Sequence, residues 1–240
     1  MIPIKDENPT EIVPYVNYLF IGLNVAAWFL LQGAGDPNAL QASVFEYGSV
    51  PCEVTGRCEV EGLSYLALVT SMFMHGGWAH LIGNMLFLWV FGNNIEDSMG
   101  HLRYIAFYLV SGLAAAAVHI FTDPSGQVPM VGASGAISGV MGAYVLLYPK
   151  VRVRYWFPPL WIFELRAIVA LGYWFLIQLA SGVVSLGPEA PGGGGVAFWA
   201  HVGGFVAGLA LIKLFEKKEL SGAKRSKRKL TRSEVARLEW

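Results

Sequence analysis

Apolar residues along the chain are grouped into six long runs that alternate with short polar segments. The runs extend over residues 14–32, 79–95, 102–121, 134–148, 161–186 and 196–215. A helix needs about 20 apolar residues to cross the hydrocarbon core of a bilayer, and these runs reach or approach that length. The pattern therefore predicts an all-α polytopic membrane protein with six transmembrane helices.

The remaining segments divide the chain into three parts. Residues 1–13 precede a membrane domain that covers 14–215, and residues 216–240 form a tail. Residues 33–78, between the first two runs, form a long loop whose apolar part, 63–74, is too short to cross a bilayer and is expected at the interface. The first run lacks the basic segment and the cleavage site of a signal peptide, so we expect it to be retained.

Composition excludes several classes of protein. Only 14% of the residues are charged and 55% are hydrophobic, against about 25% charged residues in a globular protein. Too few charges are present to cover a soluble surface, and the apolar content is too high for a disordered chain. The same composition argues against a nucleic-acid partner and indicates membrane lipids as the main surroundings.

Basic residues predict how the chain is oriented. The segment 213–240 holds ten Lys and Arg but four Asp and Glu, whereas residues 1–212 hold seven basic and thirteen acidic residues. Lys and Arg collect in cytoplasmic loops, so both termini and residues 150–154 are predicted inside, with Arg57 left outside. We expect a multi-pass protein of a bacterial-type plasma membrane, with the basic tail near anionic headgroups.

Polar residues inside the apolar runs mark candidate chemistry, because an unpaired polar group in hydrocarbon is costly. His80 and Asn84 share one helix face near the start of the second run. Ser134 opens the fourth run, about 24 Å from Lys150, and His201 lies near the start of the sixth run, about 18 Å from Lys213. These depths allow the serine and the histidine to meet below the outer surface. The alternative is a purely structural role, in which small residues pack the helices and the serine hydroxyl hydrogen-bonds to its own backbone.

Three short motifs in this order resemble the rhomboid family of intramembrane serine proteases. They are the stretch from His80 to Asn84, the stretch Gly132-Ala133-Ser134-Gly135, and Ala200-His201 followed by Gly204 and Gly208. The resemblance covers about residues 14–215 and implies a six-helix rhomboid-like bundle.

The resemblance also implies a division of roles among these residues. Ser134 would be the nucleophile and His201 its general base, without a carboxylate. His80, Asn84 and the backbone N–H of Ser134 would stabilise the oxyanion. Single-span or polytopic membrane proteins would be the substrates, and neither a metal nor a cofactor is expected. Gly132, Gly135, Gly204 and Gly208 would allow close helix packing.

Further expectations concern position 138, a glycine-rich loop, the remaining histidines and the two cysteines. Family members often have an aromatic residue four positions after the nucleophile, where this chain has Ser138. The glycine run 192–195 is expected to cap the site, His75 to be structural, His119 to be packed and hydrogen-bonded, and His101 to lie in an interfacial loop. Cys52 and Cys58 fit a loop disulfide and two free thiols equally well.

Rival functions leave different marks in the sequence. A metalloprotease would need a motif such as H-E-x-x-H, but neither His75 nor His80 is followed by Glu. An aspartyl protease would need two intramembrane Asp residues, and the six apolar runs contain none. A transporter would need polar residues along a path to the inside, whereas these residues cluster near one side. A catalytically inactive relative that binds membrane helices is the closest rival.

Overall fold

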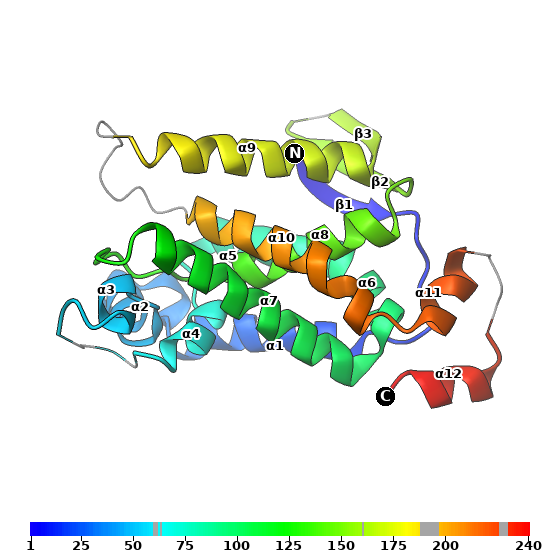
Figure 1. The fold of residues 1–240 in the computed structure, drawn as a ribbon, viewed down its shortest axis with the longest axis horizontal. Coiled ribbons are helices and arrows are strands. Elements are labelled where there is room, and N and C mark those ends of the chain that lie inside the picture. The colour runs from blue at the N-terminus through cyan, green and yellow to red at the C-terminus, as the bar shows by residue number, and fades with distance from the viewer. Residues whose placement is uncertain (60–61, 63, 160, 188–196, 226–229) are drawn as a thin grey trace.

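The computed structural model describes every residue except 60, 61, 63, 160, 188–196 and 226–229, and most of the described chain is helical (Figure 1). The predicted cap at 192–195 and most of the basic stretch in the tail therefore lie outside the described residues. The α-helices are α1 (Tyr15–Leu30), α2 (Pro37–Tyr47), α3 (Pro51–Val54), α4 (Ala67–Thr70), α5 (Trp78–Phe87), α6 (Asn93–Met99), α7 (His101–Thr122), α8 (Ser134–Leu147), α9 (Ala167–Val184), α10 (Phe198–Phe215), α11 (Lys218–Arg225) and α12 (Arg232–Leu238). The strands are β1 (Ile2–Asp6), β2 (Arg152–Phe157) and β3 (Trp161–Arg166), and the short turns are η1 (Gly33–Gly35), η2 (Ser71–Phe73) and the π-helical η3 (Leu88–Gly92).

Three of the described helices, α7, α9 and α10, are long and apolar enough to cross a membrane. The helices α1 and α8 are apolar but shorter. The run predicted as a second span is divided into α5, η3 and α6 and continues to Met99. Asn17 of α1 donates from Nδ2 to the carbonyl oxygen of Leu88, which begins the π-helical turn. The count of six spans stays a prediction.

The centre of the fold is the packing of α10 against both α7 and α8. Glycines bring α8 and α10 into backbone contact, because a methyl group on Gly204 would lie 2.0 Å from the carbonyl oxygen of Gly135. A methyl group on Gly208 would lie 1.9 Å from the carbonyl oxygen of Gly139. These glycines form the small-residue face expected from the sequence, and they fix how closely the two helices approach.

The expectation of an all-α fold and of a fifth span starting at 161 was wrong in one region. Residues 161–166 are strand β3, which pairs antiparallel with β2, and β2 pairs with β1 on its other side. The membrane-spanning part of the fifth run therefore begins at Ala167. A count of apolar residues missed the strands because β2 alternates exposed arginines with the buried side chains of Val153 and Tyr155.

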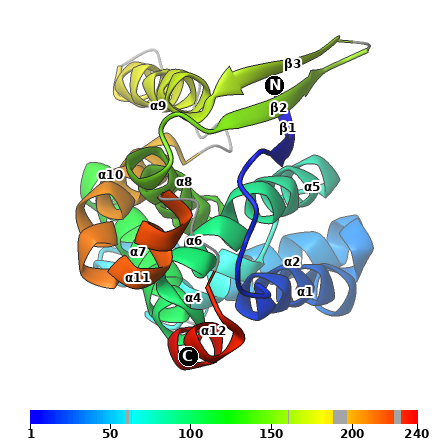
Figure 2. The same cartoon turned by 90° about the vertical axis from the view of Figure 1, so that its right-hand side faces the viewer.

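One end of the molecule gathers the segments predicted to be cytoplasmic, and we call it the tail end. The sheet lies there and reaches from α9 across to α5, while α11 and α12 lie below it (Figure 2). Asp97 accepts from the backbone N–H groups of Glu11 and Ile12, and Glu96 accepts from those of Val16 and Asn17. The two carboxylates thus hold the start of α1 at the tail end.

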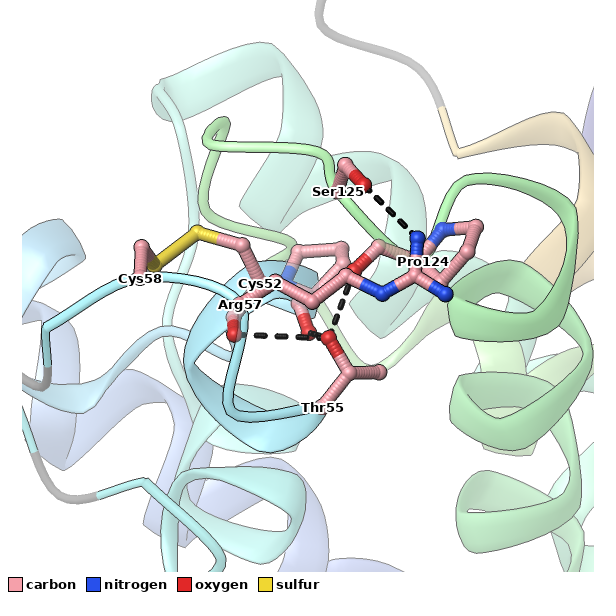
Figure 3. Close-up of a disulfide and its surroundings, with 7 residues drawn as sticks. Cys52, Thr55, Arg57, Cys58, Pro124 and Ser125 are labelled. Carbon is pink, nitrogen blue, oxygen red and sulfur yellow. Dashed lines mark hydrogen bonds between the residues drawn. A yellow bond between two sulfur atoms is a disulfide. The ribbon is translucent and has the colours of Figure 1, made fainter.

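At the opposite end, where α8 and α10 begin, the loop between α1 and α5 packs onto the segment that leads into α8. We call this end the site end. Cys52 and Cys58 form a disulfide, and Arg57 between them donates to Ser125 Oγ at 2.9 Å (Figure 3). Thr55 Oγ1 donates to the carbonyl oxygen of Pro124. The disulfide loop therefore holds the segment that precedes Ser134.

Candidate active site

Ser134 is the first residue of α8, and the backbone before it is shaped by a glycine. Gly132 has a φ of 122°, a conformation that L side chains rarely adopt, and its N–H donates to the carbonyl oxygen of Ser71 at 2.8 Å. The N–H groups in the first turn of a helix have no intrahelical acceptor. The backbone N–H groups of Ser134 and Gly135 therefore have no acceptor within α8.

His201 lies in the first turn of α10 and faces Ser134 from the neighbouring helix. Its Nε2 is 2.7 Å from Ser134 Oγ, a hydrogen-bonding distance. The structure thus brings together two polar side chains that are 67 residues apart in the sequence. The close packing of α8 and α10 at Gly135 and Gly204 makes this approach geometrically feasible.

A third side chain, which the sequence analysis missed, completes the surroundings of His201. Gln178 of α9 places its Oε1 2.7 Å from His201 Nδ1 and is 9% exposed. Gln178 is the single amide side chain in the apolar helix α9, and that isolation is the signal that could have marked it.

Trp174 supplies an aromatic contact to His201, one turn before Gln178 on the same helix. The two ring centroids are 5.7 Å apart and the planes are tilted by 40°. Ser138, where an aromatic residue was expected, instead donates from Oγ to the carbonyl oxygen of Ser134 at 2.6 Å. An aromatic ring therefore approaches the histidine from α9 rather than from α8.

His80 and Asn84 of α5 lie against Gly132. A methyl group on Gly132 would be 2.6 Å from His80 Nε2 and 3.5 Å from Asn84 Nδ2. His80 Nδ1 accepts from the N–H of Gly76 at 3.3 Å, so in the neutral ring Nε2 carries the hydrogen. Asn84 Nδ2 is buried and has no hydrogen-bond partner. Both side chains therefore place a donor atom beside Gly132, in the wall of the cavity that Ser134 also lines.

These groups line one cavity of about 1310 Å³ at the site end. Its walls include Ser134, His201, His80, Asn84 and Trp174, together with residues 128–132 of the segment before α8. The cavity has room for an extended peptide segment as well as water, and its polar lining includes Ser134, His201, His80 and Asn84.

The other histidines occupy different places. His75 is fully buried, and its backbone exchanges two hydrogen bonds of 2.8 Å with the side chain of Gln32. His119 lines the cavity, but its Nδ1 has no partner, so the expected hydrogen bond is not formed by that atom. The expectation for His101 was wrong, because it begins α7, is buried beside Glu96 and contacts the ring of Trp240.

Among the described residues, no cluster of three or more His, Cys, Asp or Glu side chains is arranged to hold a metal ion. The structure instead contains a hydrogen bond between the Ser134 hydroxyl and the His201 imidazole, and the unpaired donor Asn84 Nδ2 lies in the same cavity wall. Such a group can perform nucleophilic acyl chemistry at a carbonyl carbon.

Comparison with known proteins places this arrangement in a family. The sequence-family model named Rhomboid domain matches residues 63–218 of this chain. The chain belongs to the rhomboid family. The resemblance drawn from the sequence motifs is thereby confirmed, and the chain is a mostly helical integral membrane protein.

Curated relatives include proteases named as rhomboids. RHOMBOID-like protein 5 of Arabidopsis thaliana is 33% identical over 144 residues, which is 60% of this chain and 42% of that protein. Rhomboid protease GluP of Bacillus subtilis is 33% identical over 141 residues, 59% of this chain and 26% of that protein. The putative rhomboid protease YdcA of the same bacterium is 31% identical over 118 residues, 45% of this chain and 59% of that protein. The chain thus spans less than half the length of the first two.

Proposed function

We propose that this protein is an intramembrane serine endopeptidase that cleaves a peptide bond near the outer end of transmembrane-helix substrates. The observation that carries the proposal is the 2.7 Å contact between Ser134 Oγ and His201 Nε2 within the cavity. Membership of a family whose named members include proteases supports the same reading.

In the proposed reaction, Ser134 attacks the scissile carbonyl carbon while His201 Nε2 takes the hydroxyl proton. The carbonyl oxygen becomes an oxyanion, to which the backbone N–H of Ser134, His80 Nε2–H and Asn84 Nδ2–H donate in this proposal. His201 then returns its proton to the leaving amine. Water entering the cavity hydrolyses the acyl-enzyme, with His201 acting again as the base.

We further propose that both chain termini face the cytoplasm. The basic residues predict this orientation, and the clustering of residues 1–14, 148–159, 161–166 and 216–225 at the tail end is compatible with it (Figure 1). The site end would then open to the outside of a bacterial-type plasma membrane. In intact cells, a cysteine introduced near residue 125 of a Cys52→Ser/Cys58→Ser background should react with an impermeant reagent, and one in the tail should not. The reverse result would overturn the orientation.

The catalytic proposal is tested with purified protein and a fluorescent single-span substrate in detergent. Ser134→Ala and His201→Ala are each expected to abolish cleavage, and the double variant to be scarcely slower than either single one, because the two residues act as a unit. The matched control is Ser111→Ala, which changes a buried serine of α7 outside the cavity.

Substantial turnover by a folded Ser134→Ala protein would remove Ser134 as the nucleophile. A wild-type protein that binds the substrate but neither cleaves it nor reacts with a fluorophosphonate would instead be an inactive, helix-binding member of the family.

A further inference from the structure

Gln178 lies beside the His201 ring, and its hydrogen bond bears on which of the two ring nitrogens carries the hydrogen. Its Oε1 lies 2.7 Å from Nδ1, while Nε2 on the other side of the ring lies 2.7 Å from Ser134 Oγ. The three side chains come from α9, α10 and α8 and form a continuous hydrogen-bonded chain. Gln178 is 9% exposed, so little water competes for its amide.

The direction of these hydrogen bonds selects one form of the imidazole. An amide oxygen can only accept, so the ring nitrogen that faces Gln178 must carry the hydrogen. In the neutral ring Nε2 then keeps its lone pair and can accept from Ser134. The other tautomer would direct a hydrogen at the serine and could not take its proton.

We propose that Gln178 is the positioning residue of the catalytic base, in the place where a serine triad has a carboxylate. This inference rests on the proposed function. Gln178 fixes the tautomer and the ring orientation of His201, and its carbonyl dipole stabilises the imidazolium formed during attack, although less than a full negative charge would. It touches neither the substrate nor the reacting atoms.

Trp174 supports an action of α9 through His201. The Trp174 ring and the Gln178 amide lie one turn apart on the same face of α9. The same helix therefore supplies an aromatic contact and a hydrogen bond to the imidazole. The other titratable side chains in the wall of the cavity are His80 of α5, His119 of α7 and Asp123. Within the described part of the chain, the hydrogen-bond partners of the ring are Gln178 and Ser134, and neither is a carboxylate.

The decisive variant is Gln178→Met, which keeps the length of the side chain but removes the acceptor. We expect kcat to fall about 10- to 100-fold, because a smaller fraction of His201 then has the Nδ1–H tautomer that can accept the serine proton. KM should stay within about twofold, because Gln178 does not contact the substrate. Gln178→Glu retains an acceptor and should recover most of the rate. A carboxylate at this position stabilises the imidazolium, so the acid limb of its pH profile should move to higher pH.

The matched control is Gln32→Met. Gln32 is also a buried glutamine bonded to a histidine, but its partner is the His75 backbone. This variant should melt at a lower temperature and keep the kcat of the folded fraction. A Gln178→Met protein with wild-type kcat, or one whose loss of rate only follows its loss of melting temperature, would overturn the proposal.

A measurement independent of turnover separates this inference from the proposed function. Protein labelled with ¹⁵N-histidine should show the Nδ1–H tautomer at His201, assigned by its loss in His201→Gln, and the signal should change in Gln178→Met. A wild-type ring protonated on Nε2 would reject the positioning role whether or not the protein cleaves substrates. Lack of cleavage together with the Nδ1–H tautomer would reject only the proposed function.

Discussion

Gly132 lies directly against the ring of His80. A methyl group at Gly132 would come within 2.6 Å of His80 Nε2, and the φ of 122° at this residue is itself unfavourable for any side chain. This position, two residues before the start of α8 at Ser134, is therefore limited to glycine by two independent causes, a backbone conformation and a contact.

The substitution Gly132→Ala is expected to lower turnover at least about tenfold and to destabilise the fold by about 1–3 kcal/mol from backbone strain alone. Cleavage kinetics and a melting curve measure both effects. Gly22→Ala is the control, since a methyl group there meets no atom within 4 Å. An alanine variant with normal turnover would show that the donors of His80 and Asn84 are not aligned by this contact.

Asn84 provides a second prediction, because its Nδ2 is buried without a partner and the residue lines the same cavity as Ser134. If this atom donates to the oxyanion, Asn84→Ala should lower kcat about ten- to a thousand-fold with nearly unchanged KM and melting temperature. Asn24→Ala is the comparison, since Asn24 Nδ2 donates to the carbonyl oxygen of Phe20 within α1. That variant should lose stability and keep its rate. The reverse behaviour of Asn84→Ala would assign Asn84 to packing.

The disulfide gives a prediction about stability. Closing the short loop between Cys52 and Cys58 is expected to stabilise the fold by about 2 kcal/mol. Reduction should therefore lower the melting temperature, and it should also loosen the hydrogen bonds from Arg57 and Thr55 to the segment before α8. The chain has two cysteines, so Cys52→Ser/Cys58→Ser should melt at the lower temperature with or without reductant. An unchanged melting temperature on reduction would exclude this role.

The buried ring of His75 predicts a pH dependence of stability. Burial lowers the pKa of His75 to about 3, whereas the unfolded chain binds a proton near pH 6.5. The unfolded state therefore holds more protons between these values, and the free energy of unfolding falls as the pH drops through this window, by up to about 1.4 kcal/mol per pH unit. Melting curves at pH 7.5 and 4.5 should show a smaller difference for His75→Gln than for the wild type. Equal differences would mean that His75 does not contribute.

Apolar runs and short motifs were sufficient to predict some of these features and not others. The helices α7 and α10 follow from long apolar runs, and Ser134 and His201 stand out because polar side chains are costly in such runs. The strand β3 was missed because it begins with the apolar residues Trp161 and Ile162, which are equally common in membrane helices. These residues form a strand because they pair with β2, and this pairing cannot be seen in the local sequence.

Gln178 could not be placed for a different reason. A single glutamine in an apolar helix shows that it needs a partner, but the partner depends on the rotation of α9 relative to α10. That rotation is set by tertiary packing, which no local pattern encodes. The same holds for Trp174, whose spacing from Gln178 is visible in the sequence while its contact with His201 is not.

The glycine contacts between α8 and α10 have a consequence for protein engineering. The distance between the serine and the histidine is set by backbones that touch at Gly204 and again, one turn further, at Gly208. A designer who wished to reproduce the contact between Ser134 Oγ and His201 Nε2 in another scaffold would gain little by copying the two side chains onto helices of ordinary spacing. The smallest unit that could be transferred is the pair of helices together with their glycines, because the glycines set the distance at which the two side chains meet.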